Sequence, residues 1–71
     1  MTPKFEPDTM SYMGSISAHM MTGQFDEAIS ELNEVIKLEP NNGSAYAVRG
    51  EAYRMKKQYD AAISDFSEAI K

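Results

Sequence analysis

The feature that most constrains this chain is an internal repeat with a period of 34 residues. The heptad QFDEAIS at residues 24–30 returns as QYDAAIS at residues 58–64. When residues 9–37 are aligned with residues 43–71, 11 of the 29 paired positions are identical. The identical pairs are Tyr12/Tyr46, Ala18/Ala52, Met21/Met55, Gln24/Gln58, Asp26/Asp60, Ala28/Ala62, Ile29/Ile63, Ser30/Ser64, Glu34/Glu68, Ile36/Ile70 and Lys37/Lys71. Self-similarity at this spacing predicts a repeat architecture, in which one supersecondary unit occurs twice.

Each unit has the periodicity of two helices. In the second unit, Tyr46, Gly50 and Tyr53 fall three or four residues apart, which predicts a helix over about residues 44–56, with Asn42 or Ser44 as its N-cap. The helix that follows carries its apolar residues at the same spacing: Ala62, Ile63, Phe66, Ala69 and Ile70. The second helix of the first unit is predicted to bury Phe25, Ala28, Ile29, Leu32, Val35 and Ile36 on one face. Its polar residues Glu27, Glu31, Asn33 and Glu34 are expected mainly on the opposite face.

The residues between the helices are typical turn formers. Gly23 suits the left-handed residue that closes a helix, and Lys57 takes its place in the second unit, where a left-handed backbone costs about 1 kcal/mol or more. Pro40 stops the second helix and Asn41-Asn42-Gly43 turns the chain. The repeated heptad places Asp26 and Asp60 at the start of a helix, where each is expected to act as a cap or as a favourable negative charge.

These patterns predict an all-α chain built from two tandem helix-turn-helix hairpins. Residues 1–8, which contain Pro3 and Pro7, are expected to form a flexible N-terminal tail. The first unit is expected over residues 9–42. The second is expected over residues 43–71, truncated and without a capping helix.

The second unit carries a recognisable family pattern. Its residues Tyr46-x-x-Arg49-Gly50-x-x-Tyr53, followed by Ala62-x-x-x-Phe66, resemble the tetratricopeptide repeat, a helical hairpin of 34 residues that stacks into an α-solenoid. Tyr46 stands where the family has Trp, and Arg49 stands where it has Leu. The resemblance covers residues 9–71 and implies that two repeats are present.

The first unit departs from the family pattern in its first helix. It matches at Tyr12, Ala28, Leu32 and Pro40, but it has Ser15 in place of Leu, Ile16 in place of the small Gly, and His19 in place of an aromatic residue. The family's Gly lets two helices approach closely. We therefore expect the helix that contains Ile16 to be tilted, frayed or packed differently from its counterpart in the second unit.

Composition excludes several functional classes. The chain has no Cys, hence no disulfide and no thiolate metal site, and its single His cannot build a His-based metal cluster. A net charge of −4, with the seven basic residues scattered, argues against a nucleic-acid partner. No apolar run is long enough for a membrane span, and residues 1–8 lack the apolar core of a signal peptide. The chain is thus expected to be soluble and cytoplasmic, without a cofactor and without a membrane or nucleic-acid partner.

The sequence also predicts no enzymatic activity. A nucleophile–base pair could be built only on His19, with Ser15 or Ser17 beside it, and neither an orienting acid nor an oxyanion-hole motif is evident. His19 is therefore expected to fill the place of a packing aromatic residue. Acidic pairs such as Glu27/Glu31 and Glu31/Glu34 are expected on a solvated outer face, and the four glycines are scattered instead of forming a phosphate-binding loop.

The resemblance implies a binding surface instead. In the family, the first helix of each unit lines a concave groove that receives an extended peptide or a partner's helix. Carried onto this chain, the groove residues are Met13, Ser17, Met20 and Met21 from the first unit and Ala47, Glu51, Arg54 and Met55 from the second.

The chemistry of these groove residues indicates the kind of ligand. One subtype of the family holds a terminal carboxylate with Lys and Asn, but the corresponding places here hold Met13, Ser17, Ala47, Val48 and Glu51, so this carboxylate clamp is absent. A ligand would be held mainly by apolar contacts, for which the flexible and polarisable methionine is suited. The methionines could equally fill gaps in the core, and Arg54 could either meet an acidic partner residue or be an ordinary surface charge.

The number of repeats suggests an alternative function. Stacked repeats bury their apolar faces against neighbours, and about three units are normally needed. With two units, Ile63, Phe66 and Ile70 cannot all face inward, so one or two of them are expected to stay exposed, each worth roughly 1.5–3 kcal/mol if covered. The alternative is a structural self-assembly module, a homo-oligomer through its uncapped ends, or a fragment of a longer array with no foreign ligand.

Overall fold

The computed structural model describes residues 9–71, which form an all-helical array. The helices are α1 (Thr9–Met21), α2 (Phe25–Leu38), α3 (Gly43–Met55) and α4 (Tyr59–Ala69), and this part of the chain contains no strand. The all-α prediction is confirmed, and the helix expected over residues 44–56 is found one residue earlier as α3. The tail expected over residues 1–8 lies outside the described residues.

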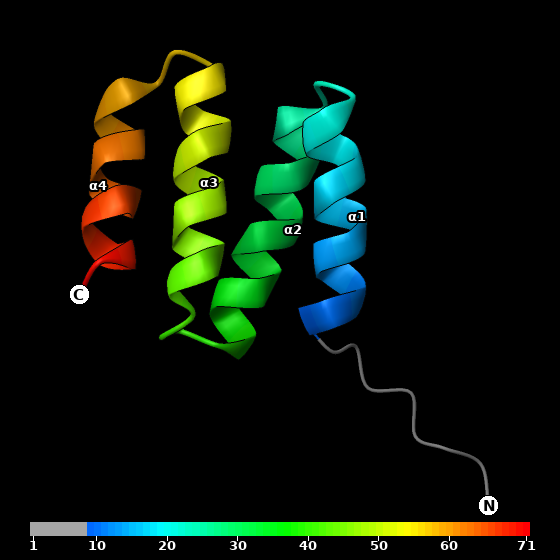
Figure 1. Cartoon of the computed structure of the whole chain (residues 1–71), viewed down its shortest axis with the longest axis horizontal. Helices are drawn as coiled ribbons and strands as arrows, with labels where there is room; N and C mark the ends of the chain where they lie inside the picture. The colour runs from blue at the N-terminus through cyan, green and yellow to red at the C-terminus, as the bar shows by residue number, and fades with distance from the viewer. Residues whose placement is uncertain (1–8) are drawn as a thin grey trace, which may run out of the picture.

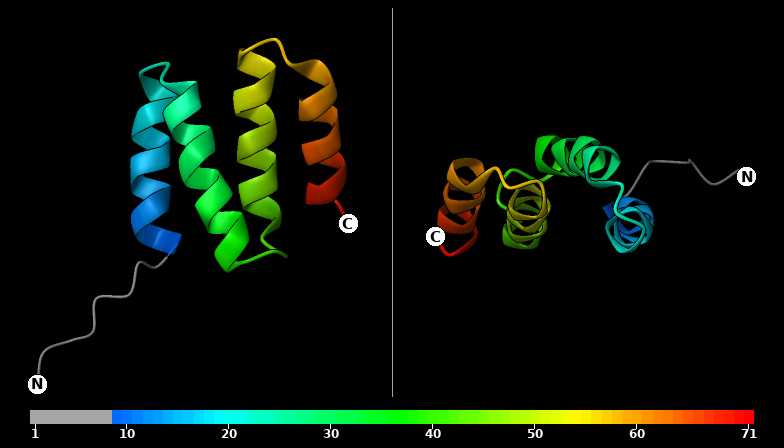
Figure 2. Two further views of the ribbon diagram at one scale, coloured as in Figure 1. Left: turned by 180° about the vertical axis from the view of Figure 1, so that it is seen from behind. Right: turned by 90° about the horizontal axis from the view of Figure 1, so that it is seen from above.

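Neighbouring helices are antiparallel and stand side by side in chain order (Figure 1). The packed pairs are α1 with α2, α2 with α3, and α3 with α4. Seen along the helix axes, α1 and α3 lie on one side of the array and α2 lies between them on the other side (Figure 2). The arrangement is two tandem helical hairpins, joined where α2 packs against α3.

The core lies where the second hairpin meets the first. Its fully buried residues come from α1, α2 and α3: Ile16, Ala28, Leu32, Val35 and Ala45. Of the six residues of the apolar face predicted for α2, Ala28, Ile29, Leu32 and Val35 are buried, and Phe25 and Ile36 are partly buried. Both α2 and α3 pack on two sides, and the contact between them joins the two hairpins.

The two hairpins fill equivalent space with different side chains. In the second hairpin, a Cβ added to Gly50 would lie 2.8 Å from Cε1 of Phe66 and 3.2 Å from the carbonyl oxygen of Ala62. In the first hairpin the equivalent positions hold Ile16 and Leu32, and both are buried in one cluster. The larger residue on α1 is thus matched by a smaller residue on α2.

The helix α1 was expected to be tilted, frayed or packed differently from α3. It is a regular helix of 13 residues, as long as α3, and is not frayed within the described residues. It packs differently, however, because α1 and α2 draw apart toward their lower ends in Figure 1, whereas α3 and α4 run side by side. That Ile16 causes this difference in packing stays a prediction.

The turns within the two hairpins have the same conformation. Gly23 has φ 77° and Lys57 has φ 64°, so both are left-handed, as the sequence predicts. In each turn the next residue closes the helix by the same bond: the N–H of Gln24 donates to the carbonyl of His19 (2.8 Å), and that of Gln58 donates to Tyr53 (2.9 Å). Lys57 therefore adopts a backbone conformation that favours glycine.

The starts of the helices distinguish between the capping residues that the sequence allowed. The N-cap of α3 is Asn42, whose Oδ1 accepts a hydrogen bond from the N–H of Ala45 (3.0 Å). For α2 and α4 the N-cap residues are Gln24 and Gln58, and neither makes a side-chain capping bond. Asp26 lies in the first turn of α2, so it contributes charge at the helix start and not a cap.

Replacing Lys57 with glycine is expected to stabilise the fold. The substitution removes a left-handed non-glycine residue, and the gain exceeds the extra entropy that glycine has in the unfolded chain. We expect the free energy of unfolding to rise by about 0.5–1 kcal/mol in urea denaturation followed by circular dichroism. The control is Gly23→Ala, which has space around its Cβ but φ 77°. It should destabilise by about 1 kcal/mol, and equal effects at the two sites would contradict the argument.

Replacing Gly50 with alanine is expected to destabilise the second hairpin by about 1–2 kcal/mol, because the new methyl group meets the ring of Phe66. Adding Phe66→Leu, which imitates the first hairpin, should remove most of that clash. The double mutant should then be more stable than the sum of the single mutants predicts by about 1 kcal/mol. The control Gly14→Ala, whose Cβ meets nothing within 4 Å, should stabilise. Additive effects of Gly50→Ala and Phe66→Leu would refute the claim that a larger residue at position 50 is accommodated by a smaller one at position 66.

Candidate functional site

The expected groove residues lie on one face of α1 and the equivalent face of α3. They form four pairs, each 34 positions apart: Met13/Ala47, Ser17/Glu51, Met20/Arg54 and Met21/Met55. The helices α1 and α3 that carry the two sets stand on the same side of the array (Figure 2). We call these eight residues the Met face.

Exposure separates the four methionines of the Met face into two kinds. Met13 and Met20 are partly buried and pack against the core, so they have a structural role. Met21 is 87% exposed and Met55 is 49% exposed, and they hold the same position at the end of α1 and of α3. The exposed methionine side chains of the Met face therefore lie at the C-terminal ends of α1 and α3.

The charged pair of the Met face is internally neutralised. Nε of Arg54 donates to Oε2 of Glu51 (3.1 Å), and the Nη2 group of Arg54 also pairs with Oε1 of Glu51. The same Nη2 lies 3.7 Å from Sδ of Met55. The hydrogen bond from Arg54 lowers the pKa of Glu51, and the bond to Glu51 raises the pKa of Arg54. Arg54 is thus engaged on its own helix.

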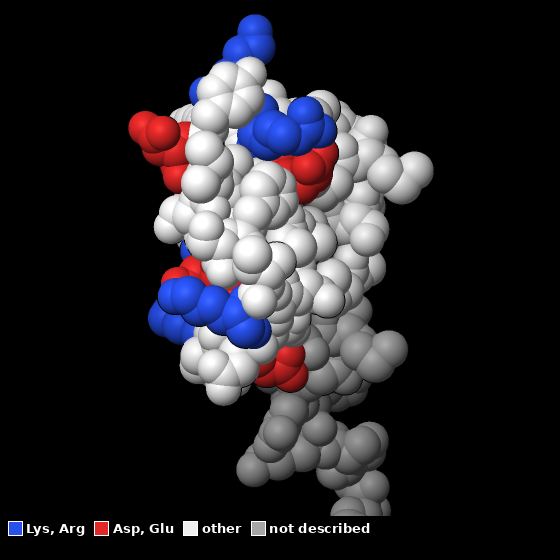
Figure 3. Space-filling model, turned by 60° about the vertical axis from the view of Figure 1, so that its left-hand side comes forward, with Lys and Arg blue, Asp and Glu red and all other residues white. Residues whose placement is uncertain are grey.

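A second apolar surface lies on α4. Tyr59, Ile63, Phe66 and Ile70 recur at helical spacing and form a stripe that we call the α4 end face. Ile63 is 62% exposed, Ile70 86% and Tyr59 57%, whereas Phe66 is half-buried against Gly50. Figure 3 shows this side of the molecule, where an uncharged band separates charged side chains above and below it. Of the three residues proposed for self-association, Ile63 and Ile70 are therefore accessible.

His19 has a partner that the sequence did not reveal. Its Nδ1 lies 2.5 Å from Oε1 of Glu31, and both side chains are half-buried. The placement of Glu31 on a solvated outer face was wrong, because α1 packs over this part of α2. The described hydrogen bonds of His19 connect it neither to Ser15 nor to Ser17. Glu31 thus holds the imidazole of His19 in place. Asp65, the equivalent of Glu31 in the second hairpin, binds the guanidinium of Arg49 instead.

The ionic centre of the second hairpin is Arg49, which the sequence suggested only as a substitute for leucine. Its Nε and Nη2 donate to Oδ2 and Oδ1 of Asp65 (2.8 and 2.7 Å), and its Nη1 donates to Oδ1 of Asn33 (2.9 Å). Asp65 is only 4% exposed, and the Tyr46 and Tyr53 rings lie 5.4 and 6.0 Å from the guanidinium carbon. The bond to Asp65 raises the pKa of Arg49. The sequence signal for this ion pair was that Arg49 stands where the family has an apolar Leu.

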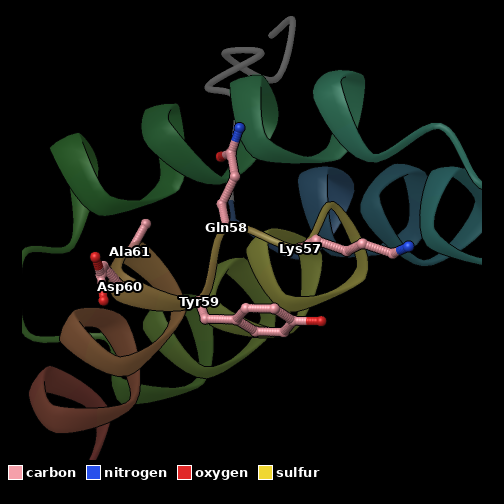
Figure 4. Close-up of a pocket in the computed structure, with 5 residues that line it drawn as sticks. All are labelled: Lys57, Gln58, Tyr59, Asp60 and Ala61. Atoms are coloured by element: carbon pink, nitrogen blue, oxygen red, sulfur yellow. The ribbon is translucent and has the colours of Figure 1, made fainter.

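Two hollows on the surface of the described residues are candidate sites, but neither gathers groups for chemistry. One, of about 500 Å³, is lined by consecutive residues at the turn between α3 and α4: Lys57, Gln58, Tyr59, Asp60 and Ala61. In Figure 4 the amine of Lys57 and the carboxylate of Asp60 point in opposite directions. The other, of about 340 Å³, includes Glu68 and Lys71, which pair with each other at 2.9 Å. These hollows follow from the turns.

Two further properties hold for the described residues. They bring together no group of three or more His, Cys, Asp or Glu side chains that could hold a metal ion. None of α1 to α4 has both the length and the apolar character needed to cross a membrane.

Comparison with known proteins identifies the family. A model described as TPR repeat matches residues 17–56, and a model described as Tetratricopeptide repeat matches residues 43–71. A search of the curated proteins and a search of the solved structures each gave no match. The first model covers more than half of the chain and spans the α2–α3 contact between the hairpins. The chain therefore belongs to the tetratricopeptide repeat family, whose repeats generally mediate protein–protein interaction.

Proposed function

We propose that the chain is a protein-interaction module that binds a short peptide or a helix of another protein along the Met face. The observation that carries the proposal is the exposure of Met21 and Met55, which hold one register position on α1 and α3 and are not used by the core. Both helices stand on the same side of the array, so one elongated ligand can touch both residues. The family supports a protein as the ligand.

The side chains of the Met face favour an apolar ligand. Flexible methionines adapt to ligands of different shape, because their unbranched thioether chains fill irregular gaps. The Glu51–Arg54 pair has no net charge, so it gives little preference for an acidic or a basic ligand. The positions that hold a terminal carboxylate in one subtype of the family have no Lys here, since they hold Ser17, Ala47 and Val48 among others. The ligand is therefore recognised through apolar side chains within a segment.

This proposal predicts that substitution of the exposed methionines weakens peptide binding. Peptides of about 15 residues selected from a displayed random library would be labelled, and their binding to the chain measured by fluorescence anisotropy. Met21→Glu or Met55→Glu should weaken binding about 10- to 100-fold, because burying one such side chain is worth about 1.5–3 kcal/mol. Ile70→Glu adds the same charge at the far end of the chain and should leave binding unchanged. Selected peptides that bind all three variants equally would overturn the proposal.

The electrostatic state of the Met face can be tested separately. Because Arg54 stabilises the charged form of Glu51, the pKa of Glu51 is lowered in the folded state. The contribution of the pair to stability is therefore present above the ordinary glutamate pKa of about 4.3 and is lost as the pH falls through the lower pKa of the folded state. In an NMR titration of the side-chain carboxyl, Arg54→Gln should raise the pKa of Glu51 toward the ordinary value. Lys37→Gln, which removes the partner of Glu34, should not change it.

A further inference from the structure

The contact between α2 and α3 shows how this chain covers an apolar stripe. On α2 the stripe consists of Phe25, Ile29, Leu32 and Ile36, and α2 packs against both α1 and α3. The same stripe recurs 34 residues later as the α4 end face. Ile29 is 9% exposed and its counterpart Ile63 is 62% exposed. The α4 end face therefore repeats the apolar surface by which α2 joins the hairpins, but on α4 this surface is exposed.

The other half of this contact is displayed on α1. In α3 the covering residues are small: Ala45 and Ala52 are fully buried two turns apart, and Val48 between them packs against the core. The counterparts of Val48 and Ala52 in α1 are Gly14 and Ala18, and both are exposed. A Cβ built on Gly14 meets nothing within 4 Å. We call the exposed residues Gly14, Ala18 and Thr22 the outer face of α1.

From these two halves we infer that the α4 end face of one copy binds the outer face of α1 of a second copy, head to tail. The contact repeats the one between α2 and α3, with bulky isoleucines of α4 lying against the small residues of α1. Nothing else in residues 9–71 covers either face. A second copy is the occupant because the same chain presents both complementary surfaces in the register of its own repeat.

The charges on the two faces permit this association although the chain has a net charge of −4. Helix α1 contains no Asp, Glu, Lys or Arg, so it does not repel the acidic residues of α4. Within the chain, two polar bonds span the contact between the hairpins: Lys56 with Asp26, and Arg49 with Asn33 at 2.9 Å. The equivalent residues at the junction between copies are Thr22 with Asp60, and Ser15 with Ser67. The junction lacks an ion pair and is weaker than the internal contact.

A head-to-tail contact joins two different surfaces, so a dimer still has one free α4 end face and one free outer face of α1. Such a contact extends into open chains unless its geometry closes a ring. Association should therefore grow with concentration beyond the dimer. It does not rest on the proposed peptide site, because Met21 and Met55 belong to neither face.

The test is sedimentation velocity of the full 71-residue chain over about a hundredfold range of concentration, in which the mean mass should rise continuously. Two variants each block one face with a charge: Ile63→Glu on α4 and Ala18→Glu on α1. Both positions are exposed, so the helical circular dichroism should be unchanged. Each variant alone should be monomeric, because it keeps one face but lacks its complement. Mixed in equal amounts, the two should form a dimer and nothing larger.

Each other outcome overturns the inference. A wild-type chain that stays monomeric throughout shows that the faces do not bind each other and that their occupant is a different protein. Dimers of Ala18→Glu alone show that α4 pairs with α4 symmetrically. A mixture of the two variants that remains monomeric also refutes the head-to-tail contact. The control Ser64→Glu adds the same charge to an exposed position of α4 outside the stripe and should associate like the wild type.

A gain of affinity gives a second readout that loss of folding cannot imitate. Thr22→Lys introduces the counterpart of Lys56, which should then pair with Asp60 of the next copy as Lys56 pairs with Asp26. The dissociation constant should fall by about two- to fivefold, the range of one exposed ion pair. Adding Asp60→Asn should cancel this gain, and a gain that persists would contradict the proposed register. Met21→Glu should alter neither result, so failure here and failure of the peptide site are distinguishable.

Discussion

The interaction on which the second hairpin depends is the ionic contact of Arg49. Its guanidinium joins three helices, because Arg49 lies on α3, Asp65 on α4 and Asn33 on α2. A buried carboxylate without a partner is strongly unfavourable, and Asp65 is almost fully buried. The fork of Arg49 satisfies both oxygens of Asp65 and uses its remaining nitrogen to hold the first hairpin. Hence one side chain fixes both the closure of a hairpin and its orientation to the next.

The two repeats solve the same packing problem with different chemistry. At one pair of positions the second repeat combines Gly50 with the large Phe66, and the first combines the large Ile16 with Leu32. At another level of the array the acid on the second helix is kept while its partner changes, from Arg49 with Asp65 to His19 with Glu31. In the first exchange a larger residue on one helix accompanies a smaller residue on the other, and in the second the acid keeps a nitrogen partner although the partner residue changes. Divergence in one helix is therefore tolerated when the helix it packs against diverges with it.

Periodicity explains which parts of the structure could be predicted from the sequence. The 34-residue repeat and the helical spacing determine the four helices of residues 9–71. The left-handed backbone of Gly23 agrees with the local preference of glycine, whereas that of Lys57 follows only from its repeat position, against the preference of lysine. The partner of Arg49 lies 16 residues away, and that of His19 lies 12 away, on other helices. Such pairs depend on how the helices pack against each other, and the spacing of residues along one helix carries no information about that packing. The same limit made the position of Glu31 wrong, because α1 covers a face that appears solvated in α2 alone.

The Met face shares no residue with the α4 end face or with the outer face of α1, so stacking of copies and binding of a ligand can occur together. If copies stack as inferred, α1 of the next copy packs against α4, in the place that the first helix of a third repeat would take. The exposed methionines of successive copies then continue the row that Met21 and Met55 begin. A ligand long enough to touch two copies would bind the stacked form more tightly than the free chain, and by linkage it would favour stacking. A peptide confined to α1 and α3 of one copy gains nothing from the second. The length of the ligand, and not its affinity for one copy, would thus decide whether binding and assembly are coupled.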